Sequence, residues 1–78
     1  MPIDDRIQKV LASVFVSHQG AFPEDWGPDQ IADWDSMNHL NLVMALGTEF
    51  GVTLGFEEML EIKTVGDIKT ILKRHNVS

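Results

Sequence analysis

Apolar positions along the chain recur at the spacing of amphipathic helices, and no segment alternates with the period of two that marks a strand. The first segment has apolar residues at helical intervals, namely Ile3, Ile7, Val10, Leu11, Val14 and Phe15. This stripe predicts a helix from about Ile3 to Phe15 whose apolar side lies in the core.

A second helix is predicted from Ser36 to Phe50, with Gly51 as its C-terminal stop. Asp35 is its expected N-cap, because a short acidic side chain can accept from the free amides of the first turn. Gly47 lies inside this helix and costs about 1 kcal/mol relative to alanine, so we expect a close approach or a kink there. The core arc is expected to comprise Leu40, Leu42, Val43, Leu46 and Phe50.

Two shorter helices follow. The segment from Phe56 to about Ile62 is so short that it should be the most mobile element. Thr64 and Asp67 then resemble a capping box, with Asp in place of Glu, at the start of a last helix. Its buried stripe is expected to be Val65, Ile68, Ile71 and Leu72, and its basic end Lys73, Arg74 and His75.

Residues 17–34 lack a helical pattern and are interrupted by Gly20, Pro23, Gly27 and Pro28. A loop this long is usually functional or held by a few apolar anchors. The candidate anchors are Phe22, Trp26, Ile31 and Trp34, of which we expect at least two to pack on the helices. An alternative role for Trp34 is to line the approach to Ser36. The prediction is one all-α domain over residues 1–78, a four-helix bundle with a long first loop and a short third helix.

Composition narrows the class of protein. With 78 residues, 44% hydrophobic and 23% charged, the chain is typical of one small folded domain. It has no cysteine, so disulfides are excluded and any thiol chemistry must come from an added group. No basic-then-apolar leader and no long apolar run occur, so we expect a soluble cytoplasmic protein without membrane insertion.

The net charge of -6 is unevenly distributed, since no Lys or Arg lies between Val10 and Ile62. Such an acidic middle repels nucleic acid and attracts basic protein surfaces. A solvated surface that serves solubility alone explains the charge equally well.

Ser36 is the candidate functional residue. It lies in the first turn of the second helix, where unpaired amides and the helix dipole favour a negative group such as phosphate. A catalytic trio of Ser36, His39 and Asp35 would also need an oxyanion hole and a substrate pocket, for which so small a domain leaves little room. We expect His39, which lies near the core arc, to be instead a half-buried histidine that is hydrogen-bonded by loop backbone.

A specific metal site is not expected. The three histidines, His18, His39 and His75, are far apart in the sequence, and no pair has the spacing of four that zinc sites use on a helix. The acidic run of Glu57, Glu58 and Glu61 lacks the spacing of a calcium loop.

The chain resembles an acyl carrier protein over essentially its whole length. The likeness rests on four blocks in order: Asp35-Ser36-Met37, matching the family's Asp-Ser-Leu signature, Leu40-Asn41-Leu42-Val43-Met44-Ala45-Leu46, Glu49-Phe50-Gly51 and Thr64-Val65-Gly66-Asp67. The resemblance implies that a phosphopantetheinyl transferase attaches the 4'-phosphopantetheine of coenzyme A to Ser36. It further implies a phosphoprotein that is not itself an enzyme and that carries acyl or aminoacyl groups as thioesters for fatty acid or secondary metabolite biosynthesis.

The resemblance also suggests where partners and cargo bind. The expected partners are the transferase and the loading and transferring enzymes, with basic docking surfaces, and we expect the carrier to be a monomer. The candidate partner-binding residues are Asp35, Met37, Met44, Glu49, Glu57 and Glu58, the first two also flanking the cofactor. The candidate acyl-cleft residues are Leu46, Phe50, Leu54, Met59 and Ile62, each of which would otherwise be ordinary core.

Two features leave alternatives open. Carriers of ordinary fatty-acid synthesis have several acidic residues along the second helix, whereas this chain has Asn38, Asn41, Gly47 and Thr48. Together with Trp34 and His39, this resembles stand-alone carriers of a secondary, cell-envelope or aminoacyl pathway. The alternative from another class is a small acidic helical adaptor that binds a basic partner and carries no prosthetic group.

Overall fold

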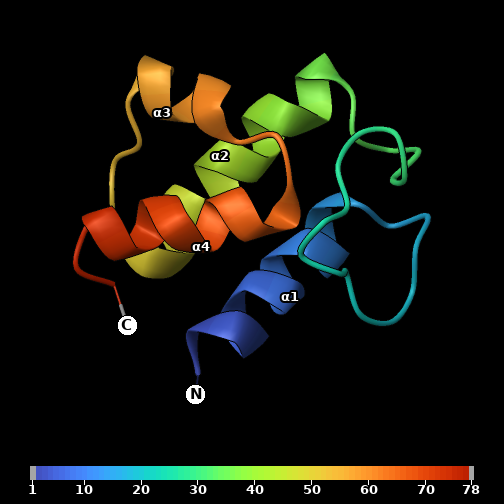
Figure 1. The fold of residues 1–78 in the computed structure, drawn as a ribbon, viewed down its shortest axis with the longest axis horizontal. Helices are drawn as coiled ribbons and strands as arrows, with labels where there is room; N and C mark the ends of the chain where they lie inside the picture. Colours follow the sequence, from blue (N-terminus) through green and yellow to red (C-terminus); the bar gives the residue numbers. More distant parts are fainter. Residues whose placement is uncertain (1, 78) are drawn as a thin grey trace.

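The structure is a computed structural model that describes residues 2–77. It contains four helices: α1 (Ile3–Val14), α2 (Ser36–Phe50), α3 (Phe56–Glu61) and α4 (Val65–Arg74). No strand occurs within these described residues. The prediction of an all-α bundle with a long first loop and a short third helix is confirmed (Figure 1).

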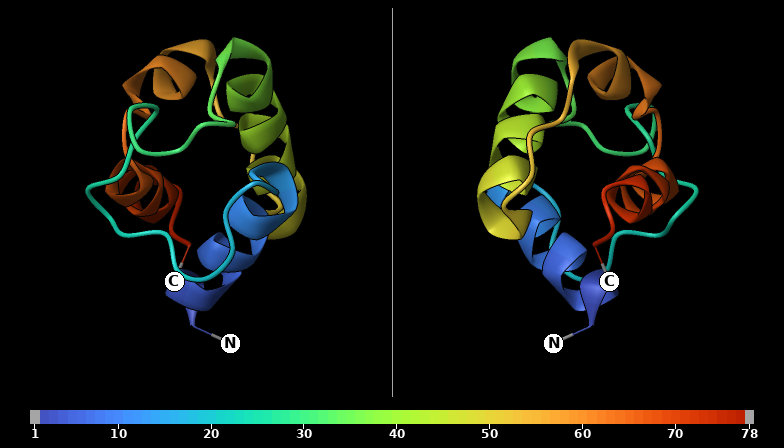
Figure 2. Two further views of the ribbon diagram at one scale, coloured as in Figure 1. Left: turned by 90° about the vertical axis from the view of Figure 1, so that its right-hand side faces the viewer. Right: turned by 90° about the vertical axis from the view of Figure 1, so that its left-hand side faces the viewer.

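The three longer helices enclose the core, and α3 lies at one end of the bundle beside the N-terminal half of α2 (Figures 1 and 2). The buried core residues of α1, α2 and α4 are joined by Phe15, Phe22, Ile31, Trp34 and Ile62 from the connecting segments. None of the residues within α3 is buried. The short helix is therefore an addition to the bundle rather than part of its core.

The predicted helix signals have the expected geometry. Asp35 accepts a hydrogen bond from the Asn38 amide at 2.8 Å, and Gly51 ends α2 in the left-handed conformation with φ of 66°. The Thr64 amide donates to the Asp67 carboxylate at 3.0 Å, and the Asp67 amide returns a bond to the Thr64 hydroxyl at 3.4 Å. These short-range contacts explain why the starts of α2 and α4 could be predicted.

Two helix ends differ by one residue from the prediction. Helix α1 ends at Val14, because Phe15 leaves the helical conformation as its C-cap while its side chain remains fully buried. Helix α3 ends at Glu61, because Ile62 is extended and inserts its side chain into the core.

The predicted core arc of α2 was wrong at Leu40. Leu42 and Leu46 are fully buried, and Val43 and Phe50 are partly buried, but the side chain of Leu40 is 50% exposed. Leu40 lines a cavity together with Met59 and Leu60 of α3, and the short α3 leaves half of its surface uncovered. The apolar periodicity of α2 could not predict this exposure, because it carries no information about the length of the neighbouring helix.

The first loop is held firmly, as the prediction of apolar anchors required. Phe22, Ile31 and Trp34 are buried, and Trp26 is partly buried. Within α1, the Gln8 amide group brackets the Phe22 backbone, donating to its carbonyl at 2.9 Å and accepting from its N–H at 2.7 Å. The loop therefore brings Trp34 to a defined place beside Ser36.

The loop is also joined to the start of α4. The amides of Val65 and Gly66 each donate at 2.9 Å to loop carbonyls, those of Trp26 and Glu24. Within α2, a Cβ on Gly47 would lie 2.8 Å from the Val52 carbonyl oxygen, so the close approach expected there is present. Among the residues described, no helix has the length and apolar character needed to cross a bilayer.

Candidate functional site: the Ser36 groove

Ser36 is the first residue of α2 and is exposed. Within residues 2–77 its hydroxyl has no hydrogen-bond partner, and neither do the amides of Ser36 and Met37. The capping is done by Asp35, whose side chain accepts from Asn38 and whose carbonyl accepts from His39 at 2.8 Å. The serine hydroxyl therefore lies at the positive end of the helix dipole and does not cap the helix.

The loop that leads to Ser36 is fixed by Asp33. Its carboxylate accepts from the Ser17 amide at 2.8 Å, and its carbonyl accepts from the Asn38 side chain at 2.8 Å. The first contact joins the two ends of the loop, and the second joins the loop to the first turn of α2. Ser36 is thus presented by a well-supported turn.

A cavity of about 610 Å³ opens beside Ser36, between the first loop, the start of α2 and α3. We call it the Ser36 groove. Its volume lies within the range of small-molecule sites, and apolar atoms dominate its lining. The lining residues are Pro28, Trp34, Asp35, Ser36, His39, Leu40, Met59, Leu60 and Ile62.

The inner wall of the groove is a hydrogen-bonded chain from the loop to α3. The Trp34 indole N–H donates to Nδ1 of His39 at 2.8 Å. Because an indole nitrogen can only donate, Nδ1 must be the accepting nitrogen of the ring. The proton of the neutral ring is then on Nε2, which donates to the Met59 carbonyl at 2.7 Å.

The prediction for His39 was correct in burial but not in its partners. The ring is half-buried as expected, yet it is bonded by a tryptophan and by the backbone of α3 rather than by loop backbone. Since both ring nitrogens are occupied, His39 does not act as a base toward Ser36 in this arrangement. The described residues therefore do not assemble the trio of Ser36, His39 and Asp35 as a catalytic unit.

The predicted cleft residues divide into two groups. Met59 and Ile62 line the Ser36 groove. Leu46 is 0% exposed in the core, and Phe50 and Leu54 pack against the core without lining the groove. Phe50 is instead covered by the Arg6 guanidinium, 4.4 Å from the ring centroid.

Four residues that line the groove were not predicted to lie in a cleft: Pro28, His39, Leu40 and Leu60. A signal existed for two of them, since His39 and Leu40 follow Ser36 by three and four residues and share its side of a helix. No comparable local signal pointed to Pro28 or Leu60, which reach the groove only through the tertiary fold.

The chain was compared with known protein families and with solved structures. No protein-family model matches the chain. A structure designated as an acyl carrier protein from Mycobacterium tuberculosis superposes with a TM-score of 0.83 at 22% identity, covering 95% of this chain and 99% of that one. The solution structure of the holo acyl carrier protein from Geobacter metallireducens gives a TM-score of 0.78 at 25% identity, covering 97% and 92%. The chain has the acyl carrier protein fold.

Both neighbours are named as carrier proteins rather than enzymes, in agreement with the expectation that this chain is not itself an enzyme. The acyl carrier protein fold supports a carrier role in general.

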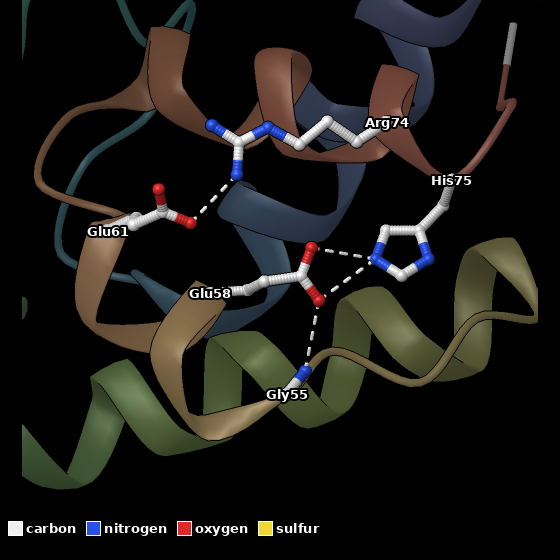
Figure 3. A network of polar contacts seen from close by, with 5 residues as sticks. All are labelled: Gly55, Glu58, Glu61, Arg74 and His75. Carbon is white, nitrogen blue, oxygen red and sulfur yellow. Dashed lines mark hydrogen bonds and ion pairs between the residues drawn. The ribbon is translucent and has the colours of Figure 1, made fainter.

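In this acyl carrier protein fold, α3 is joined to the end of α4 by an ion pair and to the C-cap His75 by hydrogen bonds (Figure 3). Glu58 lies between the Gly55 amide, at 3.1 Å, and the His75 ring, at 2.8 Å, while Glu61 pairs with Arg74 at 2.8 Å. The hydrogen bond from Gly55, and then the one from His75, lower the pKa of Glu58. Glu61 raises the pKa of Arg74 by accepting its hydrogen bond.

The predicted partner-binding residues differ in their exposure and in whether they already have an intramolecular partner. Met37 and Met44 are 75% and 63% exposed on α2, and Glu57 is exposed on α3. Glu49, however, accepts from Arg6 at 3.0 Å, and Glu58 is bound as described above. The large apolar side chains exposed on α2 and α3, here called the apolar face, are Met37, Leu40, Met44, Phe56 and Leu60.

Within residues 2–77, no three His, Asp or Glu side chains are grouped closely enough to hold a metal ion.

Proposed function

We propose that this protein is an acyl carrier protein, one domain over residues 1–78, in which Ser36 carries 4'-phosphopantetheine. The observation that supports this most directly is an exposed serine hydroxyl without a hydrogen-bond partner among residues 2–77, at the start of α2 and on the edge of an apolar groove. The same fold occurs in a holo acyl carrier protein. The carried groups are acyl or aminoacyl thioesters, which the protein presents to partner enzymes.

The residues around Ser36 suit this prosthetic group. The amides of Ser36 and Met37 and the positive end of α2 favour the phosphate, while Asp35 holds the helix start in place. Attachment would form one oxygen–phosphorus bond at Ser36, break the pyrophosphate bond of coenzyme A, release adenosine 3',5'-bisphosphate and pass the hydroxyl proton to the transferase. When bound, the group supplies the thiol that a chain without cysteine lacks.

The partners in this proposal are a phosphopantetheinyl transferase and the enzymes that load and unload the arm. They would approach Ser36 over Asp35, Met37 and Met44 on α2 and Glu57 on α3, all of which are exposed. Glu49 and Glu58 already have intramolecular partners, so we propose that the apolar face contributes more to docking than these two carboxylates.

The test is intact mass after incubation with coenzyme A, magnesium and a broad-specificity phosphopantetheinyl transferase. We expect the wild type to gain one phosphopantetheinyl unit and Ser36→Ala to gain none while keeping its helical circular dichroism. The matched control is Ser17→Ala, which removes another exposed serine hydroxyl without a hydrogen-bond partner among residues 2–77 and should load like the wild type.

The second candidate is the small acidic helical adaptor without a prosthetic group, which the apolar face would also serve. Absence of any mass gain with several transferases would contradict the carrier proposal and favour this adaptor. A pull-down with the wild type and a variant of the apolar face, such as Met44→Ser, would then identify its partner.

A further inference from the structure

A stack of three rings separates the Ser36 groove from the core. The Trp34 ring lies between Phe15, 5.1 Å away at 29°, and His39, 6.0 Å away at 24°. Trp34 is only 5% exposed although it lines the groove, so nearly all of its surface is in contact with protein. The stack extends from the end of α1 to the first turns of α2.

The stack has little freedom to move aside. If Trp34 rotated away, its indole N–H would lose the His39 acceptor, and a buried donor without a partner is unfavourable. His39 would in turn lose the orientation in which it holds the Met59 carbonyl of α3. Opening the wall therefore requires the loop, α2 and α3 to rearrange together.

Behind the stack the bundle is filled. Leu42 and Leu46, on the inner side of α2, are both 0% exposed. A second cavity, of about 310 Å³, lies between the end of α3 and α4, and it shares no residue with the Ser36 groove. Among residues 2–77, Trp34 and His39 therefore form part of the inner wall of the groove, and the bundle behind this wall is filled.

We propose that Trp34 and His39 are specificity-determining residues that limit the length of the apolar acyl chain that the Ser36 groove can hold. The inference rests on the proposed function, because the cargo reaches the groove by its attachment at Ser36. Apolar side chains dominate the lining, and the two nitrogens of His39 are already bonded, so the histidine is a wall rather than a polar anchor for the cargo. A long acyl chain would leave its distal methylenes in water.

The experiment compares carriers loaded with butanoyl, octanoyl, dodecanoyl and hexadecanoyl groups. A permissive phosphopantetheinyl transferase transfers each acyl-phosphopantetheine from the acyl-coenzyme A to Ser36 with release of adenosine 3',5'-bisphosphate, and intact mass verifies loading. The readouts are the thermal unfolding midpoint and amide exchange in α2 and α3, each measured relative to the unacylated holo protein. We expect the midpoint to rise with chain length until the chain fills the Ser36 groove, and then to stay level.

Trp34→Leu should move this plateau to longer chains, because a smaller apolar side chain removes the wall without burying a polar group. His39→Ala is the second variant, since it opens the same wall while leaving the Phe15 contact of Trp34 in the core. The matched control is Trp26→Leu. Trp26 also meets a histidine, His18, at 5.0 Å, but it does not line the groove, so the plateau should not move.

The outcomes separate the two proposals. Failure of every acyl-coenzyme A to add mass contradicts the proposed function itself. Successful loading with a midpoint that keeps rising to hexadecanoyl in the wild type overturns the length limit and leaves the carrier role intact. A plateau that neither Trp34→Leu nor His39→Ala displaces, in variants that fold and load, overturns the assignment of these two residues.

Discussion

At the scale of single residues, Asp35 and Ser36 are neighbours with different roles at the start of α2. Asp35 accepts the Asn38 amide and so stabilises the first turn, whereas the Ser36 hydroxyl makes no hydrogen bond within residues 2–77. This separation allows a serine at a helix start to be modified without disturbing the cap. Because the roles are separate, the effect of a substitution on stability shows whether Ser36 is a functional or a structural residue.

Substitution of Asp35 by alanine is expected to lower the free energy of unfolding by about 1 kcal/mol, the usual effect of removing an N-cap. Ser36→Ala should lower it by clearly less than about 1 kcal/mol, because no side-chain contact is removed. Urea denaturation followed by circular dichroism measures both. Equal losses in the two variants would mean that Ser36 takes part in the cap.

Gly47→Ala is expected to destabilise the protein by about 1–3 kcal/mol, although alanine is the better helix former by about 1 kcal/mol. The new Cβ would lie 2.8 Å from the Val52 carbonyl oxygen, which belongs to the backbone and cannot move aside cheaply. Thermal unfolding is the measurement. Thr48→Ala, at the next and exposed position of α2, is the control and should change stability by no more than about 0.5 kcal/mol.

At the scale of elements, α3 depends on polar contacts more than on burial. None of its own residues is buried, and its neighbours hold it through the Met59 carbonyl, the Glu58 carboxylate and the Glu61 carboxylate. The last of these pairs is exposed and should contribute little. We therefore still expect α3 to be the element most readily displaced from the Ser36 groove, and its mobility remains a prediction.

The Glu58 contact predicts how α3 responds to acid. The pKa of this carboxyl is lowered from the ordinary value of 4.5 by its bonds to Gly55 and His75. The stabilisation is therefore fully present above that ordinary value and is lost as the pH falls through the lowered pKa. We expect the exchange protection of α3 amides, corrected for intrinsic rates, to persist to about pH 4.5 and to decline below it.

Glu58→Gln should remove this acid dependence and reduce the protection of α3 at neutral pH. Glu57→Gln is the matched control, because Glu57 lies one residue earlier on α3, is exposed and has no ion-pair partner among residues 2–77. It should behave like the wild type. An unchanged acid response in Glu58→Gln would show that other carboxylates hold α3.

At the scale of the whole molecule, most of the negatively charged side chains lie outside the α2 surface that we propose for docking. The chain has a net charge of -6, yet the only carboxylate within α2 is Glu49, which is bound by Arg6. The side chains that project from α2 near Ser36 are instead Met37, Leu40 and Met44. Flexible methionines suit a surface that must adapt to several enzymes.

We therefore expect the transferase reaction to depend more on the apolar face than on salt. Met44→Ser should raise KM roughly tenfold, which corresponds to about 1.4 kcal/mol of lost contact. Raising the ionic strength should change kcat/KM less than this, because few free charges lie on α2. Steady-state kinetics of Ser36 modification measure both effects.

Val16→Ser is the control for this prediction, since Val16 is similarly exposed, at 72%, but lies after α1 and outside the apolar face. It should leave KM unchanged. A steep loss of kcat/KM with salt, together with an unchanged KM in Met44→Ser, would instead favour docking through the acidic residues.

The sequence by itself determined the helices, their caps and the position of Ser36, because these depend on contacts between residues a few positions apart. The Asp35 cap, the stop at Gly51 and the Thr64–Asp67 box each span no more than one turn. The close approach at Gly47 could also be anticipated, since glycine inside a helix is unfavourable without such a reason.

Only the tertiary structure decided where the groove lies and which charged side chains lack an intramolecular partner among residues 2–77. His39 bonds a carbonyl 20 residues away, His75 reaches Glu58 across 17, and Arg6 reaches Glu49 across 43. Tertiary packing also leaves Leu40 exposed. It places Trp34 and His39 in the groove wall, where Leu46, Phe50 and Leu54 had been predicted. Periodicity tells which side of a helix is apolar, but the lengths and angles of its neighbours decide which of those side chains are covered.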